Sequence, residues 1–99
     1  MTSLRNMRAG KIRRRFVFYG DVQGVGFRWQ AKQAALAAGI TGWVRNEYNG
    51  SVTMEAQGRE EQVDAVLHAL EQDRWIRITR METADLPLME EEHSFRVRF

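Results

Sequence analysis

Two stretches with helical periodicity alternate with short stretches of strand periodicity, and this order limits the folds open to the 99-residue chain. The first helix is predicted over residues 29–38, where good helix formers are concentrated and Gly39 provides a C-cap. The second helix follows Gly58, with acidic residues in its first turn and an apolar stripe. Strands are predicted over residues 12–20, 40–47, 51–57, 75–81 and 95–99.

Alternation within these strands assigns their faces. Phe16 and Phe18 point to one side of the first strand, and Val17 and Tyr19 to the other. The second and third strands flank Asn49-Gly50, a pair that supplies the positive φ angles of a tight hairpin. The third strand is expected to have an inner apolar face and an outer polar face, the latter made by Ser51, Thr53, Glu55 and Gln57.

The order β-α-β-β-α-β, followed by a last short strand, predicts the α+β class. We expect a ferredoxin-like sandwich, with an antiparallel sheet, both helices on one face and a short fifth C-terminal strand. A chain of 99 residues has room for one such domain, over residues 12–99.

Basic residues are concentrated at the beginning of the chain. Six of the 15 Lys and Arg residues precede Phe16, and no acid occurs before Asp21, which leaves nine basic and 13 acidic side chains in the rest. Residues 1–11 are therefore predicted to form a flexible basic arm. Such an arm either is a solvated tail or docks on the phosphates of a nucleic acid or membrane. Acidic residues 90–92 are expected to form a solvated turn.

Composition excludes several classes of protein. Apolar residues make up 43% of the chain, enough for a packed core, but no apolar run approaches the roughly 20 residues that cross a bilayer. The first ten residues lack the apolar segment of a secretory signal. The absence of cysteine excludes disulfides and thiolate chemistry, and no His, Asp and Glu residues have metal-ligand spacing. We expect a soluble, cytoplasmic single domain.

A glycine-rich segment over residues 20–28 connects the first strand to the first helix. Amides of such a loop converge near the helix N-terminus, where the helix dipole favours an anion. Arg28 follows the loop, and its guanidinium group can hold two phosphoryl oxygens. The segment matches neither a Walker loop nor a dinucleotide fingerprint. Taken alone, the segment favours a tight turn followed by an exposed arginine over an anion site.

Two motifs in the chain resemble those of the acylphosphatase family. Residues 22–28 read V-Q-G-V-G-F-R, close to the family's G-x-V-Q-G-V-x-F-R, and residues 42–46 read G-W-V-R-N. Both occur in the family's order and separation, and the resemblance covers about residues 15–99. A departure is Asp21, which stands where a basic or polar residue is common; its position in the strand predicts that it points outward.

The resemblance implies hydrolysis of acyl phosphates to a carboxylate and inorganic phosphate, without a metal or cofactor. The phosphate is expected to lie on a cradle formed by the backbone of the loop and the arginine, comprising Gln23, Gly24, Val25, Gly26, Phe27 and Arg28. Asn46, which ends the second motif, is expected to orient the attacking water. The resemblance thus implies Arg28 and Asn46 as the catalytic residues, and a small acyl phosphate and inorganic phosphate as the partners. We expect the enzyme to be monomeric.

Two non-enzymatic readings are alternatives. RNA-recognition domains share the predicted sandwich, but their aromatic signature belongs on the third strand, and residues 51–57 contain no aromatic side chain. An RNA-binding module is therefore disfavoured. The other alternative is a non-catalytic domain that only binds phosphate, which the presence of both Arg28 and Asn46 argues against.

Overall fold

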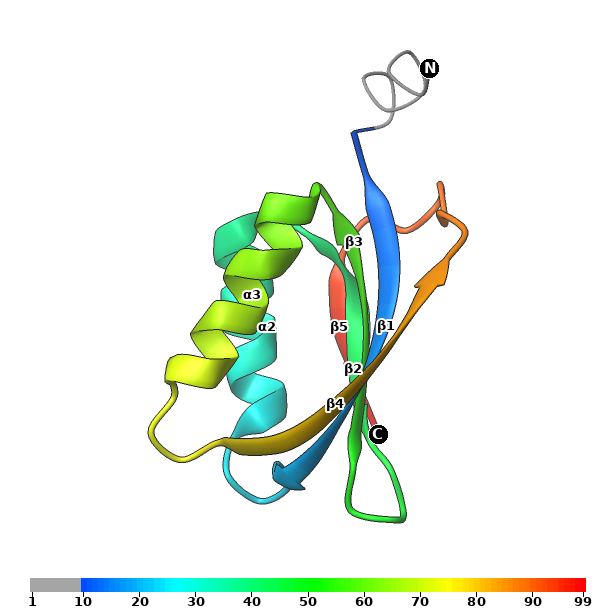
Figure 1. The fold of residues 1–99 in the computed structure, drawn as a ribbon. Coiled ribbons are helices and arrows are strands. Elements are labelled where there is room, and N and C mark those ends of the chain that lie inside the picture. Colours follow the sequence, from blue (N-terminus) through cyan, green and yellow to red (C-terminus); the bar gives the residue numbers. More distant parts are fainter. Residues whose placement is uncertain (1–9) are drawn as a thin grey trace.

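The computed structural model describes residues 10–99 and arranges them as a five-stranded sheet with two helices on one face (Figure 1). The predicted α+β ferredoxin-like fold is confirmed. The basic arm lies almost entirely outside the described residues. The elements in chain order are β1 (Ile12–Asp21), α2 (Phe27–Ala38), β2 (Thr41–Asn46), β3 (Val52–Gly58), α3 (Glu60–Gln72), β4 (Arg77–Leu86) and β5 (Phe95–Arg98).

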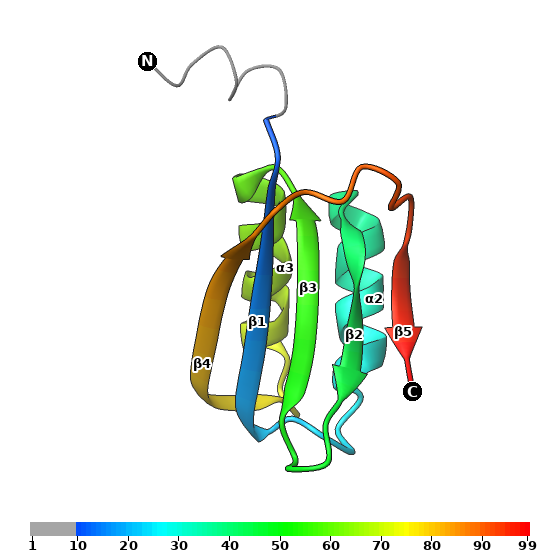
Figure 2. The same cartoon turned by 90° about the vertical axis from the view of Figure 1, so that its right-hand side faces the viewer.

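The strands are arranged in the order β4-β1-β3-β2-β5 (Figure 2). Antiparallel pairing joins β1 to β3 and β4, and β2 to β3. The prediction of a wholly antiparallel sheet is wrong at one edge, because β5 pairs with β2 in parallel. A segment over residues 87–94 makes this possible: it carries the chain from the β4 edge across to the opposite edge (Figure 2).

Aromatic side chains from β1 and α2 form the centre of the core. Phe16 and Phe18 are almost fully buried, as their position in the strand predicts. The ring centres of Phe18 and Phe27 are 5.0 Å apart, and the two rings are tilted relative to each other. Ala31 and Ala35 are also fully buried and let α2 approach the sheet closely. Because Phe27 is the first residue of α2, this packing determines where the helix begins relative to the sheet.

The outer face of β3 is covered, whereas the alternation predicted an open polar face. All seven residues of β3 are buried, including Glu55 and Gln57. The crossing segment provides part of the cover: Gln57 Nε2 donates to the Met89 carbonyl oxygen at 3.0 Å, and the Met89 N–H donates to Gln57 Oε1 at 2.8 Å. The polar side chains of β3 therefore anchor a segment that no local pattern in the sequence places there.

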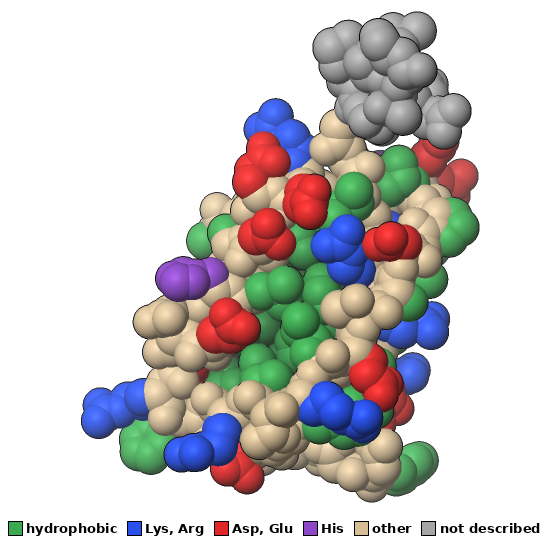
Figure 3. All heavy atoms as spheres, viewed as in Figure 1, with side chains coloured by type: hydrophobic (Ala, Val, Ile, Leu, Met, Phe, Trp, Pro, Cys, Tyr) green, Lys and Arg blue, Asp and Glu red, His purple; other side chains and the backbone are tan. Residues whose placement is uncertain are grey.

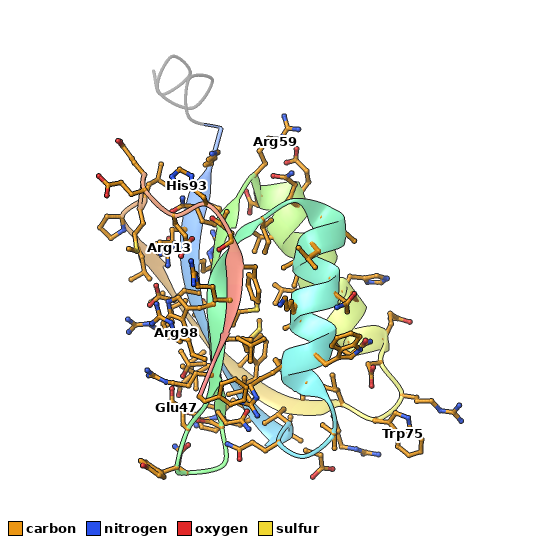
Figure 4. All side chains as sticks on the ribbon, turned by 180° about the vertical axis from the view of Figure 1, so that it is seen from behind. Arg13, Glu47, Arg59, Trp75, His93 and Arg98 are labelled. Atoms are coloured by element: carbon orange, nitrogen blue, oxygen red, sulfur yellow. The ribbon has the colours of Figure 1, made fainter. Side chains whose placement is uncertain are left out.

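A buried charge cluster lies beside this anchor, on the sheet side opposite the helices (Figure 4). Arg13 is only 2% exposed, and its guanidinium group donates to Glu55 Oε1 at 2.9 Å and to Glu92 Oε1 at 2.7 Å. The predicted solvated turn is therefore wrong for Glu92. Of the six early basic residues, Arg13, Arg14 and Arg15 belong to β1, where all three form ion pairs.

The fourth strand is displaced and lengthened relative to its prediction. It begins at Arg77 and ends at Leu86, because it pairs along nearly the whole of β1, from Arg13↔Leu86 to Asp21↔Arg77. Trp75, expected inside this strand, precedes it and is 68% exposed at the α3–β4 connection (Figure 4). Because β4 is an edge strand that is exposed over most of its length, its sequence lacks the apolar alternation from which the ends of a strand are predicted.

Between α3 and β4 the surface is hollowed, with apolar side chains exposed in the hollow and acidic ones around it (Figure 3). Phe16, Leu67 and Met81 contribute to its lining, and its volume is about 310 Å³.

No helix among residues 10–99 is long and apolar enough to span a membrane.

We predict that Arg13→Met lowers the free energy of unfolding by about 3–5 kcal/mol, because the change leaves buried carboxylates without their cation. Arg14→Met is the matched control, since Arg14 pairs with the largely exposed Asp85 and should contribute less than about 1 kcal/mol. Urea unfolding of both variants at pH 7 measures the difference. Equal losses would contradict the structural importance of the cluster.

The same cluster predicts how stability depends on pH. Burial opposes ionisation of Glu55, but hydrogen bonds and charges from Arg13 and Arg15 outweigh it and hold the pKa of Glu55 below its ordinary value. The stabilisation is therefore complete above the unfolded-state pKa of about 4.3 and is lost as pH falls through the lower folded-state pKa. The free-energy difference between wild type and Glu55→Gln, measured by urea unfolding from pH 7 to pH 3, should shrink over that acidic range. A constant difference would contradict the prediction.

Candidate active site

Three segments that are distant in the sequence meet at one end of the molecule: the β1–α2 loop, the β2–β3 hairpin and the end of β5 (Figures 1 and 2). The loop and the hairpin carry the two motifs singled out in the sequence. Their meeting follows from the topology, because β1 and β2 both end where the antiparallel β3 begins. This end of the molecule is the candidate active site.

The β1–α2 loop is an open bend anchored at both ends by buried side chains. Val22 and Phe27 are buried on either side, while Gln23–Gly26 form bends. Gly24 and Gly26 have φ angles of 74° and 82°, in the left-handed region that glycine adopts without strain. A Cβ added at either position would meet nothing within 4 Å among the described residues, so the space beside both glycines is open.

Helix α2 begins at Phe27, two residues earlier than predicted, and this places Arg28 in its first turn. The N-cap is Gly26, which has no side chain to accept hydrogen bonds, and the described first turn contains no acidic residue. The first N–H groups of α2 are therefore available to bind an anion, and the helix dipole adds positive potential around them. Local structure thus supplies the features of an anion site.

Arg28 is half-buried, and its guanidinium group lies against the end of β5. Nη1 donates to the Arg98 carbonyl oxygen at 3.1 Å, and Cζ lies 4.6 Å from the centre of the Phe99 ring. Arg98 is paired in register with Arg45, the neighbour of Asn46, so Arg28 contacts the strand that lies next to the end of β2. Arg28 lines a groove of about 1480 Å³ between α2 and β5, together with Trp29, Lys32 and Phe99. Trp29 is 64% exposed in this groove.

Asn46 ends β2, and its side-chain carbonyl oxygen is the unusual atom of the site. Oδ1 is buried and accepts no hydrogen bond from any residue in the described range 10–99. A buried acceptor left unpaired costs roughly 1–3 kcal/mol, which makes this oxygen a strong acceptor for a donor that enters the site. Asn46 lines a depression of about 510 Å³ with Gln23, Arg45, Glu47, Tyr48 and Phe99.

Asn46 and Arg28 therefore line neighbouring hollows, and Phe99 borders both. The structure groups Gln23 with Asn46 and directs Arg28 toward β5. The contributions of Phe99 and the Arg98 carbonyl group were not identified from the sequence. The strand predicted over residues 95–99 includes Phe99, although β5 ends at Arg98, and no sequence signal marks a backbone carbonyl group.

Charges around Asn46 are paired. Arg45 Nη2 lies 3.1 Å from Glu47 Oε2, and the Arg45 guanidinium group stacks on the Trp43 ring. A hydrogen bond from Thr53 lowers the pKa of Glu47, with burial opposing it and Arg45 adding to it. Glu47 is therefore a weak proton acceptor.

Asp21 points outward, as predicted, and lies 3.9 Å from Arg77.

Comparison with known proteins places the chain in a family. The acylphosphatase family model matches residues 14–97. An acylphosphatase of Oceanobacillus iheyensis is 45% identical over 82 residues, covering 81% of this chain and 90% of the relative. One from Bifidobacterium longum is 39% identical over 92 residues, covering 91% and 95%. The crystal structure of acylphosphatase from Bacillus subtilis matches with a TM-score of 0.81 at 27% identity, covering 89% of this chain and 99% of that one.

The family match includes the β1–α2 loop, Arg28 and Asn46, and it ends within β5, before Arg98 and Phe99. Together with the fold, the comparisons show that this chain belongs to the acylphosphatase family of acyl-phosphate hydrolases.

Proposed function

We propose that this chain hydrolyses acyl phosphates without a metal ion, with Arg28 and Asn46 as its catalytic residues. The observation that carries the proposal is the buried Oδ1 of Asn46, which accepts no hydrogen bond from residues 10–99 and lies at the same end of the molecule as the glycine loop and Arg28. The reaction needs both an acceptor for water and donors for phosphate, and the presence of such groups in neighbouring hollows supports the proposal.

The phosphoryl group is bound by the loop and the first turn of α2. The proposed cradle consists of the backbone of Gln23 to Phe27, with Arg28 donating through its guanidinium fork. The open space beside Gly24 and Gly26 is consistent with an anion bound at this loop. To bind it, Arg28 shares donors between the phosphoryl oxygens and the Arg98 carbonyl oxygen, since Nη1 alone bonds to β5. These donors neutralise charge on the equatorial oxygens, the main requirement of phosphoryl transfer.

Asn46 orients the nucleophile. Its Oδ1 accepts a hydrogen bond from a water molecule, and the lone pair of that water attacks phosphorus in line with the acyl oxygen. The bond between phosphorus and the acyl oxygen breaks, the carboxylate leaves with the bonding electrons, and the water protons remain with phosphate and solvent. A carboxylate is a good leaving group, so the reaction needs little help from a base. A neutral amide also holds water without repelling an anionic substrate.

The proposal extends to the form in which the enzyme works. We infer a monomeric cytoplasmic enzyme whose partners are a small acyl phosphate and inorganic phosphate, with residues 12–99 as the acylphosphatase-like domain and 1–11 as a preceding basic arm. The elements and the family match both fall within that domain. RNA binding through the sheet is disfavoured because residues 51–57 of the third strand carry no aromatic side chain and are buried.

We predict that Arg28→Ala lowers kcat/KM for benzoyl phosphate by at least about 10²-fold, because it removes a transition-state donor. Asn46→Ala should lower kcat more than it raises KM, because the water and not the substrate loses its partner. Hydrolysis is followed by ultraviolet absorbance in the presence of EDTA. Arg74→Ala is the control, since Arg74 also stacks on an aromatic ring, that of Trp75, in the α3–β4 connection. Unchanged kcat and KM in both site variants would refute the residue assignment.

Inorganic phosphate should be a competitive inhibitor, because it is a product that fits the same cradle. Its inhibition constant should rise in Arg28→Ala, and its binding should perturb amide signals of residues 23–28 in NMR titrations. Noncompetitive inhibition, or signals that move only elsewhere, would place the phosphate site outside the loop.

A further inference from the structure

In the proposed reaction the β1–α2 loop must have the correct conformation and must also be held at a fixed distance from Asn46. The hydrogen bonds of its own backbone do not hold it there. Between the buried anchors Val22 and Phe27, residues 23–26 are bends that make no hydrogen-bonded turn. Within the described chain, the side chain of Gln23 forms the hydrogen bonds that connect this part of the loop to another element.

Gln23 bridges the loop to the base of the β2–β3 hairpin. Its Nε2 donates to the Glu47 carbonyl oxygen at 2.7 Å and to the Ser51 carbonyl oxygen at 2.8 Å. A side-chain amide nitrogen has two N–H groups, so both donors are used. The hairpin closes at the same place, where the Glu47 N–H donates to the Ser51 carbonyl oxygen at 2.9 Å. One amide group therefore binds both strands of the hairpin.

The position of this bridge connects the two halves of the proposed site. Glu47 follows Asn46 directly, and Gln23 and Asn46 line the same depression. The loop on one side of the bridge would hold the phosphoryl group, and Asn46 on the other would hold the water. The distance between nucleophile and phosphorus then depends on how these two backbones are positioned relative to each other.

We propose that the side chain of Gln23 is a positioning residue: it holds the phosphate loop in register with Asn46, so that the bound phosphoryl group lies in line with the oriented water. The inference rests on the proposed function and adds a side-chain role to a residue assigned there through its backbone. A misplacement of about 1 Å at such a site costs up to about 10²-fold in rate. The effect should therefore appear in kcat, while the loop amides and Arg28 still bind phosphate.

The test replaces Gln23 by methionine, which is similar in length and lacks both donors. We expect Gln23→Met to lower kcat for benzoyl phosphate about 10–100-fold, with the phosphate dissociation constant changed less than about threefold. The matched control is Gln62→Met. Gln62 Nε2 also donates to a backbone carbonyl, that of Ala38 at 2.9 Å, but it lies at the opposite end of the molecule, at the start of α3 (Figure 1). This control should retain the wild-type kcat.

A double variant decides whether Gln23 acts through Asn46. If it does, Gln23→Met should slow Asn46→Ala by less than about twofold, because the water it helps to position is already lost. The proposal would be overturned if the kcat of the double variant fell by the product of the two single-variant factors. A kcat of Gln23→Met within twofold of wild type would also overturn it. A fall in phosphate affinity as large as the fall in kcat would indicate a merely structural role.

Failure of this inference is distinguishable from failure of the proposed function. Wild-type turnover that is lost in Arg28→Ala but unaffected by Gln23→Met would overturn only the positioning role. A folded wild-type chain without turnover would overturn the proposed function, and the inference with it.

Discussion

The buried cluster of Arg13, Glu55 and Glu92 holds together the part of the fold that completes the candidate site. Burying charges is costly, and here the cost is offset by close hydrogen bonds on both sides of one guanidinium group. The cluster ties β1 and β3 to the crossing segment, and Gln57 ties the same segment at Met89. Through this attachment β5 reaches the far edge of the sheet and pairs in parallel with β2.

The position of β5 has a direct consequence for Arg28. The guanidinium group donates to a carbonyl oxygen at the end of β5 and stacks on the ring that follows it. A mobile arginine in the first turn of a helix would lose much side-chain entropy on binding an anion, and these contacts reduce that loss in advance. The charge cluster and the proposed phosphate grip thus lie at opposite ends of β5, joined by one short strand.

Much of the fold could be predicted from local sequence, and the errors have a common cause. The inward positions of Phe16 and Phe18, the hairpin at Asn49-Gly50 and both helices follow from periodicity and turn chemistry. The outer face of β3, the burial of Arg13 and the pairing of Glu92 were not predictable, because each depends on residues 87–94 crossing the sheet. Periodicity reports on one element and carries no information about a distant segment that covers it. The length of β4 was also misjudged, since pairing with β1 determines it.

The sequence by itself determined the chemistry available to this protein: a glycine loop with free amides, one arginine in the first turn of a helix and one asparagine at the end of a strand. These residues belong to two short motifs, and the backbone conformation of the glycines is determined by their own residue type. Only the tertiary structure decided how they meet. It buried Asn46 Oδ1 with no hydrogen-bond partner among the described residues 10–99, directed Arg28 to β5 and bridged the loop to the hairpin through Gln23. These are contacts between elements far apart in the chain, and their geometry is set by strand register and packing, which no single segment encodes.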